Sequence, residues 1–272
     1  MPAKEPIRIG LAGLGAVGLE VARRLERGID GVALAAVSVR DMDKARRHLP
    51  RLGGNVRIVA LDQLPTHADV VVEGLPREAF LQVARATVEH GKIFMPLSVG
   101  QLLEHWELVD RARETGARIL VPTGALIGLD AVRAAAEGEI FSVTMITRKP
   151  PAGLDGAPYL VERNIQMSDV KEPTKVFDGS AREGARGFPA NVNVAAALSL
   201  AGIGPDRTCL QIWADPTVDR NTHRIEVDAD TARFSMTIEN VPSTENPRTG
   251  RITALSAVAA LRGLVSTLKV GT

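Results

Sequence analysis

Short apolar runs alternate with segments of helical periodicity through the first 121 residues. The apolar runs cover residues 7–11, 32–39, 69–73, 92–95 and 118–121, and helices are expected at 17–25, 77–89 and 101–114. Strict alternation of this kind is typical of βα units that build a parallel sheet with helices on both faces. The pattern predicts a doubly wound α/β domain.

The periodicity changes after residue 122. Strands are expected at 140–147, 176–177, 209–213, 224–227 and 233–239, with a helix at 194–200 and a glycine-rich turn at 184–187. This half predicts an α+β domain with a mostly antiparallel sheet. A last helix over 252–268 has apolar residues that could pack back on the first domain. We therefore predict a dinucleotide-binding domain of residues 1–122 plus 251–272, and a catalytic and dimerisation domain of residues 123–250.

A glycine motif follows the first strand. Gly13, Gly15 and Gly18, with Ala16 and Val17 between the last two, form G-x-G-x-x-G at the start of an amphipathic helix. The first glycine permits the tight turn, the second lets the backbone approach a pyrophosphate, and the third lets helix pack on strand. The helix N-terminus supplies amide donors for the phosphates. Because the motif lies between a strand and a helix, it predicts a Rossmann-type site for NAD or NADP.

The end of the second strand leaves the choice of cofactor open. Arg40 is a residue type that accommodates the 2′-phosphate of NADP, whereas Asp41 is one that binds the ribose of NAD. Each could equally be a solvated loop charge. Further along, four residues follow strands whose carboxyl ends should flank the nicotinamide half, although a simple turn role fits them equally well: Gly74, Pro76, Ser98 and Gly100.

Composition narrows the class of protein. Lys and Arg number 33 against 32 for Asp and Glu, which gives no support to a nucleic-acid partner. One cysteine, Cys209, fits a reducing compartment. No apolar run approaches ~20 residues, and no signal-peptide core is expected at the N-terminus. The histidines show no metal-ligand spacing. We expect a cytoplasmic protein with no metal and no membrane segment.

A polar connection at residues 215–223 lies between two strand-like runs. It begins with Asp215 and ends with His223, the one histidine after His105. Loops of this composition on a rigid scaffold often carry chemistry. Taken alone, the connection fits a polar surface turn with a solvated imidazole better than a site. Asp215 could be either a turn starter or a partner that orients the histidine.

With these elements in place, the chain resembles the L-aspartate dehydrogenase family over nearly its whole length. Beside the glycine motif, the resemblance is carried by segments in the second half: residues 122–125 with 128–130, 149–151, 188–189 with 191–195, 214–216 with Asn221 and His223, and 238–243 with 245–247. The glycine motif alone would fit many enzyme classes, but N-V-N-V and D-P…N-x-H separate this family from its relatives.

The resemblance implies NAD(P)-dependent oxidative deamination of L-aspartate to iminoaspartate, and then to oxaloacetate and ammonium. It implies that His223 is the catalytic residue and that Ala125 and Asn193 contact the cofactor. It also implies a homodimer formed through the second domain, and an iminoaspartate product that can feed NAD biosynthesis.

The residue chemistry agrees with this assignment. Oxidising an amine needs a base for the ammonium proton, and hydrolysing an imine needs an activated water; an imidazole with a pKa near neutrality can serve both steps. Two substrate carboxylates need cationic or backbone donors. The candidates for substrate binding are Lys149, Arg220 and Asn221, with Arg224 and Arg248 as further loop cations.

Two other classes of function remain open. One is another two-domain reductase, of the homoserine dehydrogenase or dihydrodipicolinate reductase type. The latter would show paired histidines with a lysine in the second domain, whereas His223 has no histidine partner there. The other class is a non-enzymatic NAD(P)-binding sensor, which would need the glycine turn but not His223.

Overall fold

The computed structural model describes residues 5–48, 56–189, 192–244, 246 and 249–271. The chain forms two compact units. Unit 1 comprises Met1–Pro122 and Ala254–Lys269, and unit 2 comprises Thr123–Thr253 and Val270–Thr272. Within the described residues, no helix has both the length and the apolar content needed to cross a bilayer.

Unit 1 contains a six-stranded parallel sheet with strand order β3-β2-β1-β4-β5-β6. Its strands are β1 (Ile7–Ala12), β2 (Val32–Ser38), β3 (Arg57–Ile58), β4 (Val70–Glu73), β5 (Ile93–Pro96) and β6 (Arg118–Ile119). Successive strands are added on one side of β1 up to β3 and on its other side from β4 onward, so the strand order switches between β1 and β4. Doubly wound sheets bind their ligands at this switch point. The predicted fold class is confirmed for this unit.

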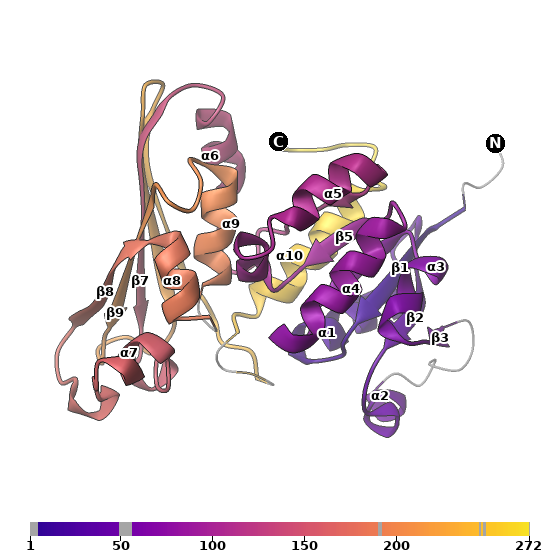
Figure 1. The fold of residues 1–272 in the computed structure, drawn as a ribbon, viewed down its shortest axis with the longest axis horizontal. Coiled ribbons are helices and arrows are strands. Elements are labelled where there is room, and N and C mark those ends of the chain that lie inside the picture. Colours follow the sequence, from indigo (N-terminus) through magenta and orange to yellow (C-terminus); the bar gives the residue numbers. More distant parts are fainter. Residues whose placement is uncertain (1–4, 49–55, 190–191, 245, 247–248, 272) are drawn as a thin grey trace. The chain divides into compact units, whose positions relative to one another are not determined.

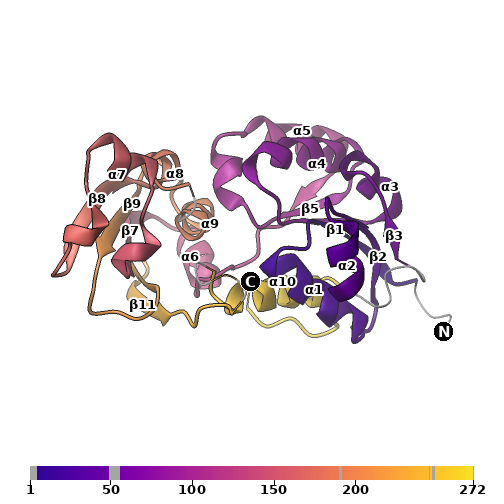
Figure 2. The ribbon, with the colours of Figure 1, turned by 90° about the horizontal axis from the view of Figure 1, so that it is seen from below.

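Helices cover both faces of this sheet. They are α1 (Ala16–Glu26), α2 (Met42–His48), α3 (Leu64–His67), α4 (Arg77–Glu89), α5 (Glu107–Thr115) and α10 (Ile252–Gly263), with a short 3-10 turn at Leu61–Gln63. Figure 2 shows α4 and α5 on one face, and α1 and α10 on the other. Ala257 and Leu261 of α10 are fully buried in the core formed with β1, β2 and α1. The last long helix therefore completes the first unit.

The predicted helix over residues 101–114 is wrong in its first half. Val99–Leu103 forms a 3-10 helix with bonds such as Gln101 N–H to the Ser98 carbonyl, and α5 begins only at Glu107. All five residues of the 3-10 helix are buried. A surface helix has one apolar and one polar face, whereas this segment is buried on every side. It is therefore not the first turn of an amphipathic helix that continues to residue 114.

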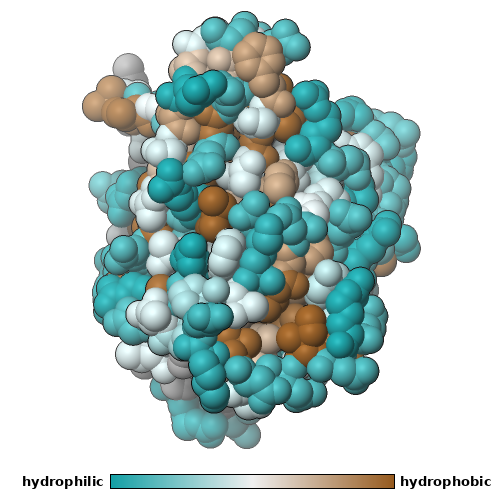
Figure 3. Space-filling model, turned by 90° about the vertical axis from the view of Figure 1, so that its left-hand side faces the viewer, coloured by the Kyte–Doolittle hydropathy of each residue, from teal (hydrophilic) through white to brown (hydrophobic). Residues whose placement is uncertain are grey.

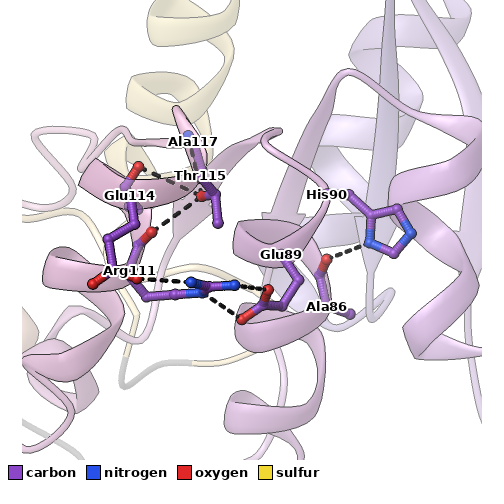
Figure 4. Close-up of polar contacts among 8 residues, drawn as sticks. Ala86, Glu89, His90, Arg111, Glu114, Thr115 and Ala117 are labelled. Carbon is purple, nitrogen blue, oxygen red and sulfur yellow. Dashed lines mark hydrogen bonds and ion pairs between the residues drawn. The ribbon is translucent and has the colours of Figure 1, made fainter.

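Helices α4 and α5 are joined at the surface by an arginine. The Arg111 guanidinium donates two hydrogen bonds to the Glu89 carboxylate, at 2.8 and 2.6 Å, and a third to Glu114 at 2.7 Å (Figure 4). Just after α4, Nδ1 of the C-cap residue His90 lies 2.7 Å from the Ala86 carbonyl oxygen. These groups are solvated and fit a structural role in holding two neighbouring helices together.

Unit 2 contains a five-stranded sheet with strand order β11-β10-β7-β9-β8. Its strands are β7 (Ile140–Lys149), β8 (Thr174–Ser180), β9 (Thr208–Ala214), β10 (Thr222–Ala229) and β11 (Arg233–Glu239). The β7–β9 pair is parallel and the other three pairs are antiparallel. The predicted mostly antiparallel sheet is confirmed.

One face of this second sheet is covered by helices. Unit 2 has α6 (Leu129–Ala135), α7 (Pro158–Glu162), α8 (Ala181–Gly187) and α9 (Asn193–Ala201), with 3-10 turns at Pro151–Gly153 and Met167–Asp169. Figure 1 shows α8 and α9 packed beside β7, β8 and β9. The opposite side is seen in Figure 3, where hydrophilic side chains surround separate apolar groups.

The predicted glycine-rich turn at 184–187 is wrong, because these residues belong to helix α8. Ser180 accepts a hydrogen bond from the Glu183 N–H, while the Glu183 carboxylate accepts one from the Ser180 N–H. This reciprocal capping box opens the helix and offsets the low helix propensity of glycine. Gly184 is needed there, since an added Cβ would lie 2.5 Å from Leu210 Cδ2.

Candidate active site

The glycine motif of unit 1 forms a closely packed turn between β1 and α1. Gly13 has a φ of +92°, and an added Cβ would lie 2.7 Å from the Gly74 carbonyl oxygen. An added Cβ on Gly18 would overlap the Gly13 carbonyl oxygen. Side chains are therefore excluded at both positions for the two reasons that the sequence suggested: backbone conformation at Gly13 and close packing at Gly18.

The middle of this motif has room for a ligand. An added Cβ on Gly15 would meet no atom within 4 Å, and Gly15 is exposed at the N-cap of α1. Ala16 and Val17 form the first residues of that helix and are half-buried. Helix α1 has no side-chain cap hydrogen bond. Its first amides are thus oriented to receive an anion, which fits the pyrophosphate of a dinucleotide.

Arg40 lies two residues after the end of β2 and is exposed, as is Asp41. This is the strand end at which a doubly wound domain meets the adenosine ribose. The role of Arg40 in reading a 2′-phosphate remains a prediction.

A buried carboxylate lies at the same end of the sheet, where the strands of unit 1 have their carboxyl ends. Glu73, the last residue of β4, is 0% exposed. Its Oε1 accepts hydrogen bonds from Leu75 N–H at 2.7 Å and Ser98 Oγ at 3.0 Å, and its Oε2 accepts from Ser98 N–H at 3.1 Å. Burial raises the pKa of Glu73, and these donors act against that rise. The carboxylate ties the turn after β4 to the loop after β5.

In unit 2, His223 lies in a strand and not in the predicted connection. It is the second residue of β10 and pairs with Thr147 of β7. The imidazole is 3% exposed, and its Nδ1 lies 3.0 Å from the Thr147 hydroxyl. A strand position and a buried partner fix the ring in one orientation. Because Nδ1 faces Thr147, Nε2 is the ring nitrogen that can serve a substrate.

Lys149 adds a positive charge to the same region. It lies two residues after Thr147 on β7, on the same face of the strand, and it is 4% exposed. Burial, and then the charge of Lys149, lower the pKa of His223 to about 3. The ring is therefore neutral at physiological pH in this state of the protein, with a pKa well below the near-neutral value that the sequence suggested.

The hydrogen bonds of the Asp215 carboxylate join it to Thr217 and Arg148, not to the histidine. Its Oδ1 accepts hydrogen bonds from Thr217 N–H at 2.9 Å and Thr217 Oγ1 at 2.6 Å, and its Oδ2 accepts one from Arg148 at 3.0 Å. Burial would raise the pKa of Asp215, but these donors outweigh it and hold the pKa below its usual value. The structure favours the turn-starter interpretation, with Arg148 also stacked 4.7 Å from the centre of the Trp213 ring.

Ala125 is held in its turn by a buried asparagine. The Asn240 side chain donates a 3.0 Å hydrogen bond to the Ala125 carbonyl, and the Asn240 N–H donates one to the Asn221 carbonyl at 2.8 Å. Asn240 therefore links two of the predicted site residues. Asn193 is the exposed first residue of α9.

The predicted cationic residues have different surroundings. Arg220 is bonded to the neighbouring Asp219 at 2.8 and 3.0 Å, and Arg224 to Glu226 at 2.8 Å. Arg248 lies outside the described residues. Lys149 alone of the described candidates is both buried and close enough to influence His223.

Comparisons with known proteins place these features in a family. The family described as "Aspartate dehydrogenase, C-terminal" matches residues 130–264, and "Homoserine dehydrogenase, NAD binding domain" matches residues 13–122. The chain is 55% identical over 270 residues to L-aspartate dehydrogenase of Bradyrhizobium diazoefficiens, covering 99% of this chain and 96% of that one. The chain belongs to the L-aspartate dehydrogenase family. The resemblance found in the sequence is confirmed.

Another relative and a solved structure also match over nearly the whole chain. L-aspartate dehydrogenase 3 of Bordetella bronchiseptica is 53% identical over 273 residues, covering 100% of both chains. The solved aspartate dehydrogenase of Thermotoga maritima has the same fold, with a TM-score of 0.76 at 24% identity over 97% of this chain and 99% of that one. The predicted fold class and the nicotinamide-dependent enzyme class are confirmed, whereas the choice between NAD and NADP stays open.

For this member of the family, sequence reasoning missed Glu73, Thr147 and Asn240. Glu73 left one usable indication, because a carboxylate ends an otherwise apolar run. Thr147 left none, since its partner His223 is 76 residues away. Asn240 belongs to a segment that carried the resemblance, but its bond to Ala125 spans 115 residues.

Proposed function

We propose that this chain catalyses the NAD(P)-dependent oxidative deamination of L-aspartate to iminoaspartate, which is hydrolysed to oxaloacetate and ammonium. The observation that carries the proposal is the buried His223, Thr147 and Lys149 cluster in a chain 55% identical to an L-aspartate dehydrogenase. We further propose that the reaction takes place in the cytoplasm and supplies iminoaspartate for NAD biosynthesis.

His223 is the proposed catalytic base. With Nδ1–H donating to the Thr147 hydroxyl, Nε2 carries a lone pair that can accept a proton from the substrate ammonium. Loss of this proton gives the amine whose Cα can release a hydride. After Nε2 has released that proton to solvent, the same nitrogen can accept a proton from the water that attacks the imine carbon.

Lys149 is proposed to bind a substrate carboxylate. A buried ammonium is a strong partner for an anion because little water screens the attraction. A dicarboxylate beside Lys149 would also offset the charge that lowers the pKa of His223. Substrate binding would thus raise the basicity of His223 when a base is needed. Arg220 and Asn221 remain weaker candidates for the second carboxylate.

The cofactor is proposed to bind to unit 1 through Gly13, Gly15, Ala16, Val17 and Gly18. The exposed Gly15 and the open N-terminus of α1 fit the pyrophosphate. When bound, the nicotinamide ring supplies the hydride acceptor. Ala125 and Asn193 of unit 2 are proposed to contact the same cofactor, as the resemblance implies.

The first test compares His223→Ala with the unchanged protein. Each is assayed for cofactor reduction with L-aspartate, other amino acids and L-homoserine. We expect turnover with L-aspartate in the unchanged protein and a kcat about 10²–10⁴-fold lower in the variant, because a general base typically contributes this factor. The dissociation constant of the cofactor should change little.

The same screen separates the competing functions. Preferred turnover of L-homoserine would support the homoserine dehydrogenase type, and cofactor binding without turnover of any amino acid would support a sensor. A near-normal kcat in His223→Ala would contradict the role proposed for His223.

Cofactor choice is tested with Arg40→Ala. If Arg40 binds the 2′-phosphate, its removal should weaken NADP by about tenfold and leave NAD within about twofold, since a charge-assisted hydrogen bond is worth about 1.5 kcal/mol or more. Titration calorimetry with both cofactors measures this. Equal effects on NAD and NADP would show that Arg40 does not read the 2′-phosphate.

We propose that unit 2 also forms a homodimer through the helix-free face of its sheet. Half-buried Ile146 and Trp213 lie on this face beside Arg148 and Arg224, because β10 pairs Arg224 with Ile146 and β9 pairs Trp213 with Arg148. Sedimentation equilibrium of the unchanged protein and of Ile146→Glu measures the mass. A monomeric unchanged protein would contradict this proposal without affecting the proposed chemistry.

A further inference from the structure

Each oxygen of the Glu73 carboxylate accepts a hydrogen bond from a backbone N–H. Leu75 N–H donates to Oε1 at 2.7 Å and Ser98 N–H donates to Oε2 at 3.1 Å, while the Ser98 hydroxyl lies 3.0 Å from Oε1 and 3.5 Å from the Leu75 carbonyl oxygen. A backbone N–H can only donate, so one such donor on each oxygen favours the ionised carboxylate, which accepts hydrogen bonds and donates none. A carboxylate that is 0% exposed thus holds a negative charge inside unit 1.

This charge lies beside the glycine turn. Gly74, the next residue, donates its N–H to the Ala12 carbonyl at 2.9 Å, and its own carbonyl oxygen is the atom that leaves no room for a Cβ on Gly13. The bonds to Ser98 extend the same edge to the loop after β5. Glu73 therefore lies behind the carboxyl ends of β1, β4 and β5, where doubly wound sheets hold their dinucleotide.

No ion pair joins Glu73 to a cation within the described part of the chain. Asp69, at the other end of the same strand, differs in this respect. It is bonded to Arg8 at 2.8 Å and to Lys92 at 3.3 Å, and the hydrogen bond from Arg8 is the largest influence that lowers its pKa. Burying a charge without an opposite charge is costly, so a buried carboxylate at a ligand-binding edge points to a cation supplied by the ligand.

We propose that Glu73 is a buried positioning residue whose negative charge makes the cofactor site prefer the oxidised nicotinamide over the reduced one. The oxidised ring carries a positive charge and the reduced ring is neutral, so only the oxidised form gains from a nearby anion. Glu73 acts from behind the loops that it ties together and does not touch the ring. In the direction of deamination, weaker binding of the reduced cofactor favours its release.

The inference rests on the nicotinamide cofactor of the proposed function and deepens it. The experiment measures the dissociation constants of the oxidised and the reduced cofactor, without substrate, by titration calorimetry and by cofactor fluorescence. The unchanged protein is compared with Glu73→Gln, which keeps the side-chain size and removes the charge. We expect the preference for the oxidised form to fall by about fivefold to thirtyfold.

Two further variants separate charge from structure. Asp69→Asn removes a carboxylate from the opposite edge of the sheet and should leave the ratio of the two dissociation constants unchanged. Ser98→Ala removes one donor and keeps the charge of Glu73, which becomes less compensated. The preference of Ser98→Ala for the oxidised over the reduced cofactor should equal or exceed that of the unchanged protein, even if both forms of the cofactor bind more weakly.

The outcomes decide between the alternatives. If Glu73→Gln leaves the ratio of the two dissociation constants unchanged, the inference is overturned. A purely structural role would weaken the oxidised and the reduced cofactor equally and so leave this ratio as it is. If Glu73→Gln does not fold, a fall of the ratio in Ser98→Ala would overturn it instead. Binding of neither form by the unchanged protein would count against the proposed cofactor itself, which makes the two failures distinguishable.

Discussion

At the scale of single residues, Thr147 determines how His223 can work. The two side chains are opposite each other on neighbouring strands and both are buried. The hydroxyl can accept from Nδ1–H or donate to Nδ1, and only the first arrangement leaves Nε2 as a base. Thr147 is thus a positioning residue, comparable in function to the carboxylate or carbonyl that orients many catalytic histidines.

Thr147→Val removes the hydroxyl and keeps the side-chain shape. We expect kcat to fall about threefold to tenfold, the value of one hydrogen bond of about 1 kcal/mol, with the KM for the cofactor unchanged. The acidic limb of the kcat profile against pH should also shift. Thr147→Ser should restore both, and a Ser variant as impaired as Val would assign the effect to packing.

The residues that sequence predicted well are those whose reasons are local. Gly13 and Gly18 are required by a turn of six residues, so spacing alone revealed them. Glu73 bonds to Ser98 across 25 positions, and Thr147 to His223 across 76. Such partners become neighbours only when strands are paired, and a single sequence does not specify that pairing.

At the scale of elements, the start of α8 shows how one cap outweighs composition. Glycine at positions 184 and 187 favours a turn, but the Ser180–Glu183 capping box satisfies two backbone donors at once. The helix then brings Phe188 against Phe177, with ring centres 5.4 Å apart. The S-x-x-E pattern was visible in the sequence, whereas the packing that accepts the glycines was not.

Ser180→Ala should destabilise the protein by about 1 kcal/mol, the usual cost of losing an N-cap hydroxyl. Urea unfolding followed by circular dichroism measures the change. Ser180→Thr retains the hydroxyl and serves as the matched control. Equal stability of the Ala variant and the unchanged protein would show that α8 does not depend on its cap.

At the scale of the whole molecule, buried His223 makes stability depend on pH. Its pKa is about 3 in the folded protein, from burial first and Lys149 second, against an ordinary 6.5. Above about pH 6.5 the ring is neutral in both folded and unfolded states. Below that value the unfolded chain takes up a proton that the folded protein refuses, so stability falls as the pH falls toward 3.

We therefore expect the free energy of unfolding to decrease by about 3 kcal/mol more between pH 7 and pH 4 in the unchanged protein than in His223→Gln. Urea titrations at both pH values measure this difference. The comparison removes the contribution of the carboxylates that the two proteins share. Parallel pH dependence in both proteins would contradict a strongly lowered pKa for His223.

The overall plan was more predictable than its details. Alternating apolar runs predicted the parallel sheet because strands buried on both faces leave a continuous apolar signature. The mixed sheet of unit 2 gave weaker patterns, and β8 extends over seven residues where only two were expected. Its length depends on pairing with β9 rather than on its own composition.

Helix α10 has a consequence for synthesis of the chain. It supplies Ala257 and Leu261 to the core of unit 1, yet nearly all of unit 2 precedes it in the sequence. A ribosome therefore synthesises nearly all of the second unit before the first unit can be completed. Until α10 emerges, the apolar surface of α1 and β1 that it covers is exposed to solvent. During this interval the nascent protein is prone to aggregate with other chains through that surface.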